Sequence, residues 1–139
     1  TTITAAETGH LVIGTLHTKG AVNSIDRIID SFPSYHQAQI RMMLSSVLRT
    51  VVSQELLPGV NGDRVPAFEI MHVNSAIRSL IRDNKNHQIN NAITAGRAEG
   101  MISMDQAILE LYRADLITKE TAISYADNPE QLRRHLDQK

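Results

Sequence analysis

The feature that most limits the fold of this chain is a short apolar run near its start. Leu11, Val12 and Ile13 lie in the sequence GHLVIGTLHT, which covers residues 9–18. A run of this length that is apolar on both faces and bounded by glycine is typical of a strand buried in a parallel sheet. Because ligands of open α/β sheets bind beyond the carboxyl ends of the strands, we expect a ligand-facing edge at the end of this run.

Two histidines flank the run, and their spacing separates their roles. His10 precedes the predicted strand, and His17 ends it seven residues later. On one strand the two rings would lie roughly 23 Å apart and point to opposite faces, so a single metal ion could not bind both. Thr15, His17 and Thr18 would stand at the ligand edge. A neutral His17 ring could donate to a phosphate oxygen, or it could cap the strand by bonding a carbonyl, and the sequence leaves both alternatives open.

A phosphate-binding loop of the spacing G-x-x-x-x-G-K-[ST] is missing from the sequence. Gly9 and Gly14 have the required glycine spacing, but Thr15 and Leu16 follow where lysine is needed. No apolar strand ends in a pair of acidic residues, so the sequence offers no obvious anchor for Mg²⁺. We therefore expect no catalytic residue and no metal site in this chain.

The composition is that of an ordinary globular domain. The chain has 139 residues, of which 42% are hydrophobic and 21% charged, and these values suit one soluble domain. A net charge of −1 gives no broad basic field, so we expect no nucleic-acid partner. Cysteine is absent, and no apolar run approaches the roughly 20 residues of a transmembrane segment. The chain starts at Thr1 inside an apparent helix, which predicts that it is a fragment.

Apolar periodicity predicts two helices after the run. Residues 21–32 and 40–51 each carry apolar side chains at helical spacing. Pro33 ends the first helix, and Ser34 with Gln37 forms a capping-box signature for the second.

A β-hairpin follows these helices. Residues 54–57 and 65–73 have a strand-like pattern, and Asn61-Gly62 between them is a strong turn signal. Asn74 is the expected N-cap of the next helix, over residues 75–83. The remainder of the chain is helical, with further N-cap signatures at Ser103 and Asn128.

The helix at residues 75–83 is amphipathic. Its apolar face consists of Ala76, Ile77, Leu80 and Ile81. Arg78 and Arg82 form an i,i+4 basic pair outside this face, and the residues alone favour two solvated arginines on a core helix.

Three of these stretches resemble a known family. The sequence TAAETGHLVIGTLHT, at residues 4–18, is similar to the histidine box of the secretion and type IV pilus motor ATPases. DRIIDSFP at 26–33 and SAIRSLIR at 75–82 are similar to the PilT-like twitching motility ATPases, which are the retraction branch of that superfamily. Where close members have asparagine after the AIR motif, this chain has Ser79, which leaves the retraction role of that helix open.

The resemblance implies an α/β fold, the C-terminal part of a RecA-like ATPase domain with a buried strand and a β-hairpin, followed by a mostly helical tail. Residues 1–73 would belong to the motor domain, and 74–139 would form the helical C-terminal region with the AIR-type retraction helix. The family's phosphate loop, acidic box and magnesium-binding strand all precede the histidine box.

The resemblance also implies a fragment of a motor that hydrolyses ATP with Mg²⁺ and powers type IV pilus retraction and twitching motility. Identical subunits would form a ring, expected to be a hexamer, in the cytoplasm against the inner-membrane platform of the pilus machinery. Without a phosphate loop, this fragment alone would be inactive and would bind no cofactor. By resemblance, the nucleotide-sensing residues are His10, Thr15, His17 and Thr18, and those of the retraction helix are Ala76, Ile77, Arg78 and Leu80.

Two alternatives stay open. One is a pilus-assembly or type II secretion ATPase, although those relatives usually carry a four-cysteine zinc insertion that this chain lacks. The other is a helical interaction module without enzymatic activity.

Overall fold

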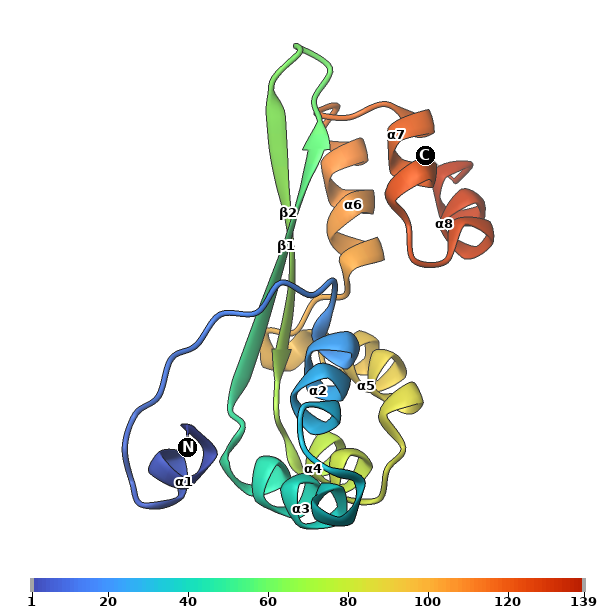
Figure 1. The fold of residues 1–139 in the computed structure, drawn as a ribbon. Coiled ribbons are helices and arrows are strands. Elements are labelled where there is room, and N and C mark those ends of the chain that lie inside the picture. The colour runs from blue at the N-terminus through green and yellow to red at the C-terminus, as the bar shows by residue number, and fades with distance from the viewer. Residues whose placement is uncertain (1, 139) are drawn as a thin grey trace.

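A long two-stranded antiparallel ribbon runs through the molecule in the computed structural model, which describes residues 2–138 (Figure 1). Strand β1 covers Thr50–Pro58 and β2 covers Arg64–His72, and the two pair from end to end. Gly62 takes a left-handed backbone conformation, with φ of 79°, in the turn between them. The predicted hairpin is confirmed, and β1 begins four residues earlier than expected, at Thr50 rather than residue 54.

Four helices gather around one end of this ribbon. They are α2 (Ala21–Asp30), α3 (Gln37–Val47), α4 (Ser75–Arg82) and α5 (Ile89–Ala95) (Figure 1). Their apolar faces, with Met71 of β2 and Met101, form a first buried cluster, whose largest fully buried members are Ile25, Ile29, Met71, Ile77, Ile81, Ile89, Ile93 and Met101. Helix α1 (Thr2–Glu7) adds Ile3 to this cluster.

Three more helices lie beside the other half of the ribbon (Figure 1). They are α6 (Met104–Arg113), α7 (Lys119–Tyr125) and α8 (Pro129–Leu136). A second buried cluster forms between them and the ribbon, from Leu57, Val65, Ala67, Met104, Ala107, Ile108, Leu109, Ile117, Ala122, Leu132 and Leu136. Short 3₁₀ turns at Ser34–His36, Asn86–Gln88 and Arg97–Glu99 connect the longer elements.

Side-chain caps explain where several helices begin. Asn74 accepts a hydrogen bond from the Ile77 amide at 2.9 Å, and Ser103 accepts one from the Gln106 amide at 3.2 Å. Asn128 caps α8 in the same way, with a proline in the first turn. These three predicted N-caps are confirmed.

The predicted capping box before α3 is wrong. Ser34 starts a 3₁₀ turn, and α3 begins at Gln37 without a side-chain cap. The side-chain amide of Gln37 instead donates a hydrogen bond from Nε2 to the Phe32 carbonyl at 3.1 Å. Helix α3 also ends at Val47, earlier than predicted, because Leu48 is extended and the chain then enters β1.

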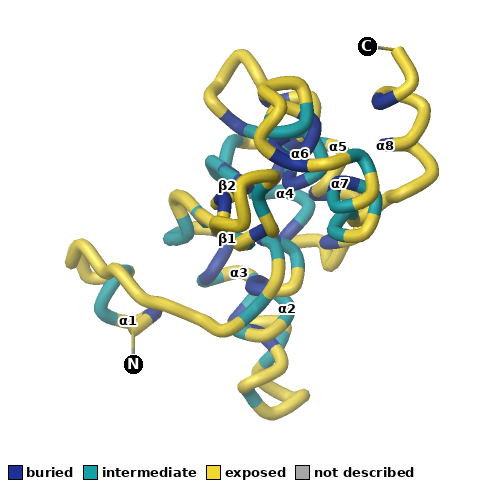
Figure 2. Tube along the Cα trace, turned by 90° about the horizontal axis from the view of Figure 1, so that it is seen from above, coloured by how far each residue is buried: buried dark blue, intermediate teal, exposed yellow. Residues whose placement is uncertain are grey.

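The predicted buried strand at the apolar run is also wrong. Residues 10–18 form neither helix nor strand, and Leu11 and Ile13 are 91% and 87% exposed. Figure 2 shows this stretch exposed as it leaves α1 and crosses toward the rest of the molecule. A strand requires a neighbour for its backbone hydrogen bonds, and no segment within residues 2–138 pairs with this one. None of the helices in the same range is long and apolar enough to span a bilayer.

Candidate functional site

The histidine-box segment, residues 9–18, begins where α1 ends. Gly9 closes the helix with φ of 95°, a conformation that suits glycine. The Nδ1 atom of His10 lies 3.0 Å from the Ala5 carbonyl and 3.1 Å from the Thr8 hydroxyl. His10 therefore closes the C-terminal turn of α1, five to eight residues before the other predicted site residues Thr15, His17 and Thr18.

The other predicted members of the histidine box lie toward the end of the segment. Thr15 and His17 are exposed, and within the described residues no group hydrogen-bonds the His17 ring. Thr18 is half-buried, and its hydroxyl lies 2.7 Å from the Ser24 hydroxyl in the first turn of α2. Within the described residues, the His17 ring is thus free near the end of the segment. The next residue, Thr18, attaches the segment to α2.

A buried carboxylate, Glu69, holds the residues that follow the segment. Its side chain is 2% exposed, and Oε1 accepts a hydrogen bond from the Ala21 amide at 2.8 Å. The second oxygen, Oε2, accepts one from the Met104 amide at 3.1 Å. Burial raises the pKa of Glu69 above its ordinary value, and the two amides act in the opposite direction.

Sequence reasoning missed Glu69, although a signal was present. In β2 the inward-facing positions alternate as Val65, Ala67, Glu69 and Met71, and all four are buried. A charged residue in the buried register of a strand indicates a specific partner, because an unpaired charge there is costly.

More charged groups surround this carboxylate. Lys19 Nζ lies 3.0 Å from Glu55 Oε1 and 3.7 Å from an oxygen of Asp127. The hydrogen bond to Glu55 raises the pKa of Lys19, while burial, followed by the nearby Asp105 carboxylate, raises the pKa of Asp127. An open hollow of about 140 Å³ lies here, lined partly by Glu69, Lys19 and Asp127.

Asp105 adds a second carboxylate that binds two backbone amides. Its oxygens accept hydrogen bonds from the amides of Asp127 at 2.7 Å and Asn128 at 2.9 Å. This pair of bonds joins the first turn of α6 to the start of α8 and does not involve the histidine-box segment.

Helix α4 carries the predicted retraction residues in two environments. Ile77 is fully buried and Leu80 is half-buried. Ala76 is exposed, so the prediction that it belongs to the buried apolar face is wrong. Arg78 is half-buried, and its Nε donates to the Ser45 carbonyl of α3 at 3.1 Å. The expectation that both arginines are solvated is therefore wrong for Arg78, while Arg82 is exposed and lies 3.4 Å from Asp83.

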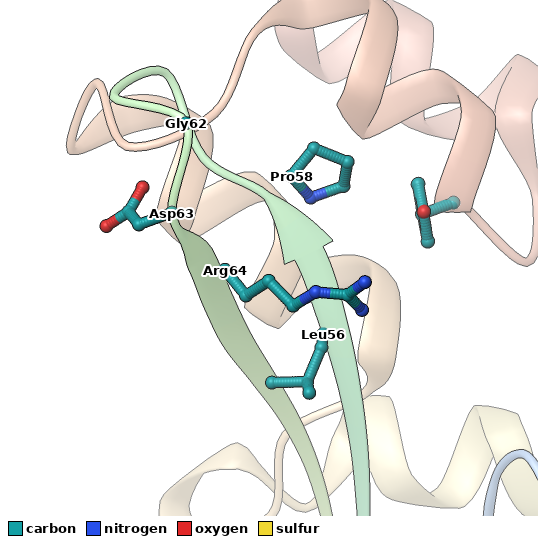
Figure 3. Close-up of a pocket in the computed structure, with 6 residues that line it drawn as sticks. Leu56, Pro58, Gly62, Asp63 and Arg64 are labelled. Atoms are coloured by element: carbon teal, nitrogen blue, oxygen red, sulfur yellow. The ribbon is translucent and has the colours of Figure 1, made fainter.

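A second hollow of about 220 Å³ opens at the tip of the ribbon. Figure 3 shows Arg64 reaching from β2 across to β1, near Leu56, with Asp63 pointing away from it. Leu56, Pro58, Gly62, Asp63, Arg64 and Tyr125 line it. This lining brings together no acid, base and nucleophile that could act as a catalytic set.

No metal site is present among residues 2–138. Within that range, no three side chains of the metal-binding types come close enough to hold an ion. The described residues therefore do not offer, by themselves, a set of ligands that fits Mg²⁺.

Comparisons with known proteins match nearly the whole chain. The family model described as "Type II/IV secretion system protein" matches residues 1–136. A twitching motility protein of Neisseria gonorrhoeae is 49% identical over 131 residues, which are 94% of this chain and 35% of that protein. The type IV pilus retraction ATPase PilT of Pseudomonas aeruginosa is 47% identical over 128 residues, 92% of this chain and 37% of PilT.

A solved structure agrees with these sequence matches. The crystal structure of the pilus retraction motor PilT with bound ADP aligns with a TM-score of 0.84 and 44% identity, over 96% of this chain and 37% of that one. The chain thus spans about a third of the length of the relatives it matches. The expected fold class, an α/β chain corresponding to the C-terminal part of the PilT ATPase domain, is confirmed at this level. The chain belongs to the type II/IV secretion system protein family, and it is similar to the PilT-type members of that family.

Proposed function

We propose that this chain is part of an ATP-hydrolysing motor that powers type IV pilus retraction and twitching motility. The observation that carries the proposal is the 49% and 47% identity, over more than nine-tenths of the chain, to a twitching motility protein and a pilus retraction ATPase. The exposed apolar run does not by itself support the assignment, so the proposal depends on this similarity.

In this motor the histidine-box segment senses the state of the nucleotide. His17, with its ring free, donates a hydrogen bond to a phosphate oxygen of ATP, and Thr15 and Thr18 lie on either side of it in the segment. Loss of the γ-phosphate removes this bond, and the change at the end of the segment biases a rotation of the domain. His10, which closes α1, sets where the segment begins.

The phosphates and Mg²⁺ are held by residues outside this chain, which has neither a phosphate loop nor a fitting metal site among its described residues. Residues 1–139 alone are therefore inactive. Identical subunits form a ring, which we propose to be a hexamer, and hydrolysis takes place between neighbouring domains.

Helix α4 serves retraction rather than hydrolysis. Residues 1–73 belong to the motor domain and 74–139 to the C-terminal region, although both contribute to the first buried cluster. The exposed Ala76 offers an outward contact, while Ile77, Arg78 and Leu80 anchor the helix to the body. The pilus-side partner is the inner-membrane platform, and the ring works on the cytoplasmic side at the pilus base.

Deletion of the gene in its own organism tests the proposal. We expect cells that still display pili but no longer twitch, because extension does not require the retraction motor. The full-length protein should restore twitching, and when purified it should hydrolyse ATP. Cells without pili would instead favour a pilus-assembly ATPase, and blocked protein export a type II secretion ATPase. Full-length protein without ATP turnover would favour a helical interaction module.

A further inference from the structure

We infer that Glu69 is a positioning residue that joins the start of α2, directly after the histidine-box segment, to the start of α6, so that a displacement of one is transmitted to the other. Ala21 lies 48 residues before Glu69 in the sequence, and Met104 lies 35 residues after it. One carboxylate thus connects three distant parts of the chain. The motor would use this joint to pass on a change at His17, and only that use rests on the proposed function.

Each oxygen of Glu69 accepts a hydrogen bond from the first amide of a helix, Ala21 of α2 or Met104 of α6. In neither helix does an N-cap side chain bond this first amide. Gly20 precedes α2 and has no side chain with which to cap it. Ser103 caps α6 through the Gln106 amide and leaves the Met104 amide to Glu69. The first amides of a helix lack partners within the helix and carry partial positive charge, so an ionised carboxylate suits both ends.

Gly20 delivers the Ala21 amide to this carboxylate. Its φ of 86° is a conformation that other residues rarely adopt, and it turns the chain directly from the segment into α2. A β-carbon added at Gly20 would lie 3.6 Å from Glu69 Oε1, which is ordinary contact. A substitution at Gly20 would therefore disturb the backbone at the joint without a direct clash with Glu69.

The opposite side of the joint is firmly held on the ribbon. Ile70, the neighbour of Glu69, exchanges two backbone hydrogen bonds with Ile102, at 2.9 and 3.0 Å. Residues 102–104 are therefore held against β2 and would move with it. On the segment side, Thr18 bonds Ser24, and Lys19 pairs with Glu55 of β1. A shift of residues 18–21 consequently acts on Glu69 and, through it, on the start of α6.

A double-mutant cycle in the full-length protein tests the joint by hydrogen exchange, without nucleotide. Gly20→Ala disturbs the segment side, and exchange is measured in peptides covering residues 17–25 and 101–108. We expect Gly20→Ala to raise exchange in both peptides, by about fivefold in the second. Glu69→Gln has one acceptor oxygen in place of two, so it can serve only one amide. In that background Gly20→Ala should raise exchange in 17–25 alone.

Asp105→Asn is the matched control. Asp105 is also a carboxylate that accepts two backbone amides, but it joins α6 to α8. In the Asp105→Asn background, Gly20→Ala should still raise exchange in 101–108 by about fivefold. A peptide covering α3 reports general loosening and should change little in any variant.

Additive effects in the Glu69→Gln background would overturn the inference, because two independent caps would give that result. If Glu69→Gln does not fold, the Gly20→Ala single variant decides. Raised exchange in both peptides with α3 unchanged supports the joint, and raised exchange confined to 17–25 overturns it. Since no nucleotide is present, these results do not depend on ATP turnover, and a failure of the proposed function would be seen separately.

Discussion

Two opposing effects act on the pKa of Glu69. The side chain is almost fully buried, which disfavours its charge, yet it accepts hydrogen bonds from two amides that favour the charge. Burial is the larger effect, so the pKa of Glu69 lies above its ordinary value of 4.5. An apolar side chain of the same size would leave the Ala21 and Met104 amides buried without partners, at about 1–3 kcal/mol each.

This raised pKa predicts the pH dependence of stability. As pH rises from 4.5 through the pKa of folded Glu69, the folded state keeps a proton that the unfolded state has lost. The contribution of Glu69 to the free energy of unfolding therefore falls as pH rises in that window and is constant above it. The stability difference between the native protein and Glu69→Gln should decrease across the same window, as measured by urea unfolding at several pH values. A difference that grows with pH would contradict this.

His17 gives a second prediction at this scale. In the full-length protein, His17→Ala should change the free energy of unfolding by less than about 0.5 kcal/mol, because the ring is exposed and makes no hydrogen bond within residues 2–138. ATP turnover should fall by roughly tenfold or more, because a donor to the phosphate is lost. The exposed His87 is the control, and His87→Ala should leave turnover unchanged. Equal turnover in wild type and His17→Ala would remove His17 from the mechanism.

At the scale of elements, helix α4 combines an anchored side with an exposed one. Ile77 and Ile81 are fully buried, and Arg78 bonds α3, so the helix has little freedom to shift alone. Ala76, by contrast, faces outward at the second position of the helix. A role in retraction would therefore act through this exposed surface.

Aspartate substitutions at two matched alanines test that role. Ala76 and Ala38 are both exposed and both second in their helices, α4 and α3, where a carboxylate suits the helix dipole. Each variant should keep its stability within about 0.5 kcal/mol. Ala76→Asp should abolish twitching while ATP turnover of the purified full-length protein is retained, and Ala38→Asp should affect neither. Normal twitching in Ala76→Asp would argue against a contact at this surface.

The elements predicted correctly from the sequence depend on local signals. The turn at Asn61-Gly62 and the caps at Asn74 and Ser103 form between residues a few positions apart. The run at 11–16 has the composition of a strand, but its pairing would come from elsewhere, and composition cannot supply a neighbour.

The candidate site divides in the same way. Motif resemblance predicts His17 as a site residue, which stays a prediction, and the structure adds that its side chain is exposed. Glu69 was missed because both of its partners lie more than thirty residues away, at distances of 48 and 35 positions. The sequence of its own helix predicts a solvated Arg78, because the Ser45 carbonyl that Arg78 bonds belongs to another helix, α3.

At the scale of the whole molecule, the chain spans about a third of the length of its relatives, and its sequence contains no phosphate loop. We therefore predict that purified residues 1–139 neither bind ATP tightly nor hydrolyse it. Isothermal titration with ATP and a phosphate-release assay would check both points, with the full-length protein as the positive control. Turnover above the buffer rate by the purified chain would contradict the prediction.

The ribbon has a mechanical consequence of its own. Its nine-residue strands carry Met71 into one buried cluster and Leu57 into the other, so each cluster grips a different stretch of the same two strands. Two-stranded antiparallel ribbons twist more strongly than larger sheets. We expect such a ribbon to change its twist more easily than its length, because stretching it would strain extended backbone. Winding or unwinding it by a few degrees per residue pair would swivel one group of helices about the other while every rung of the ladder stayed closed.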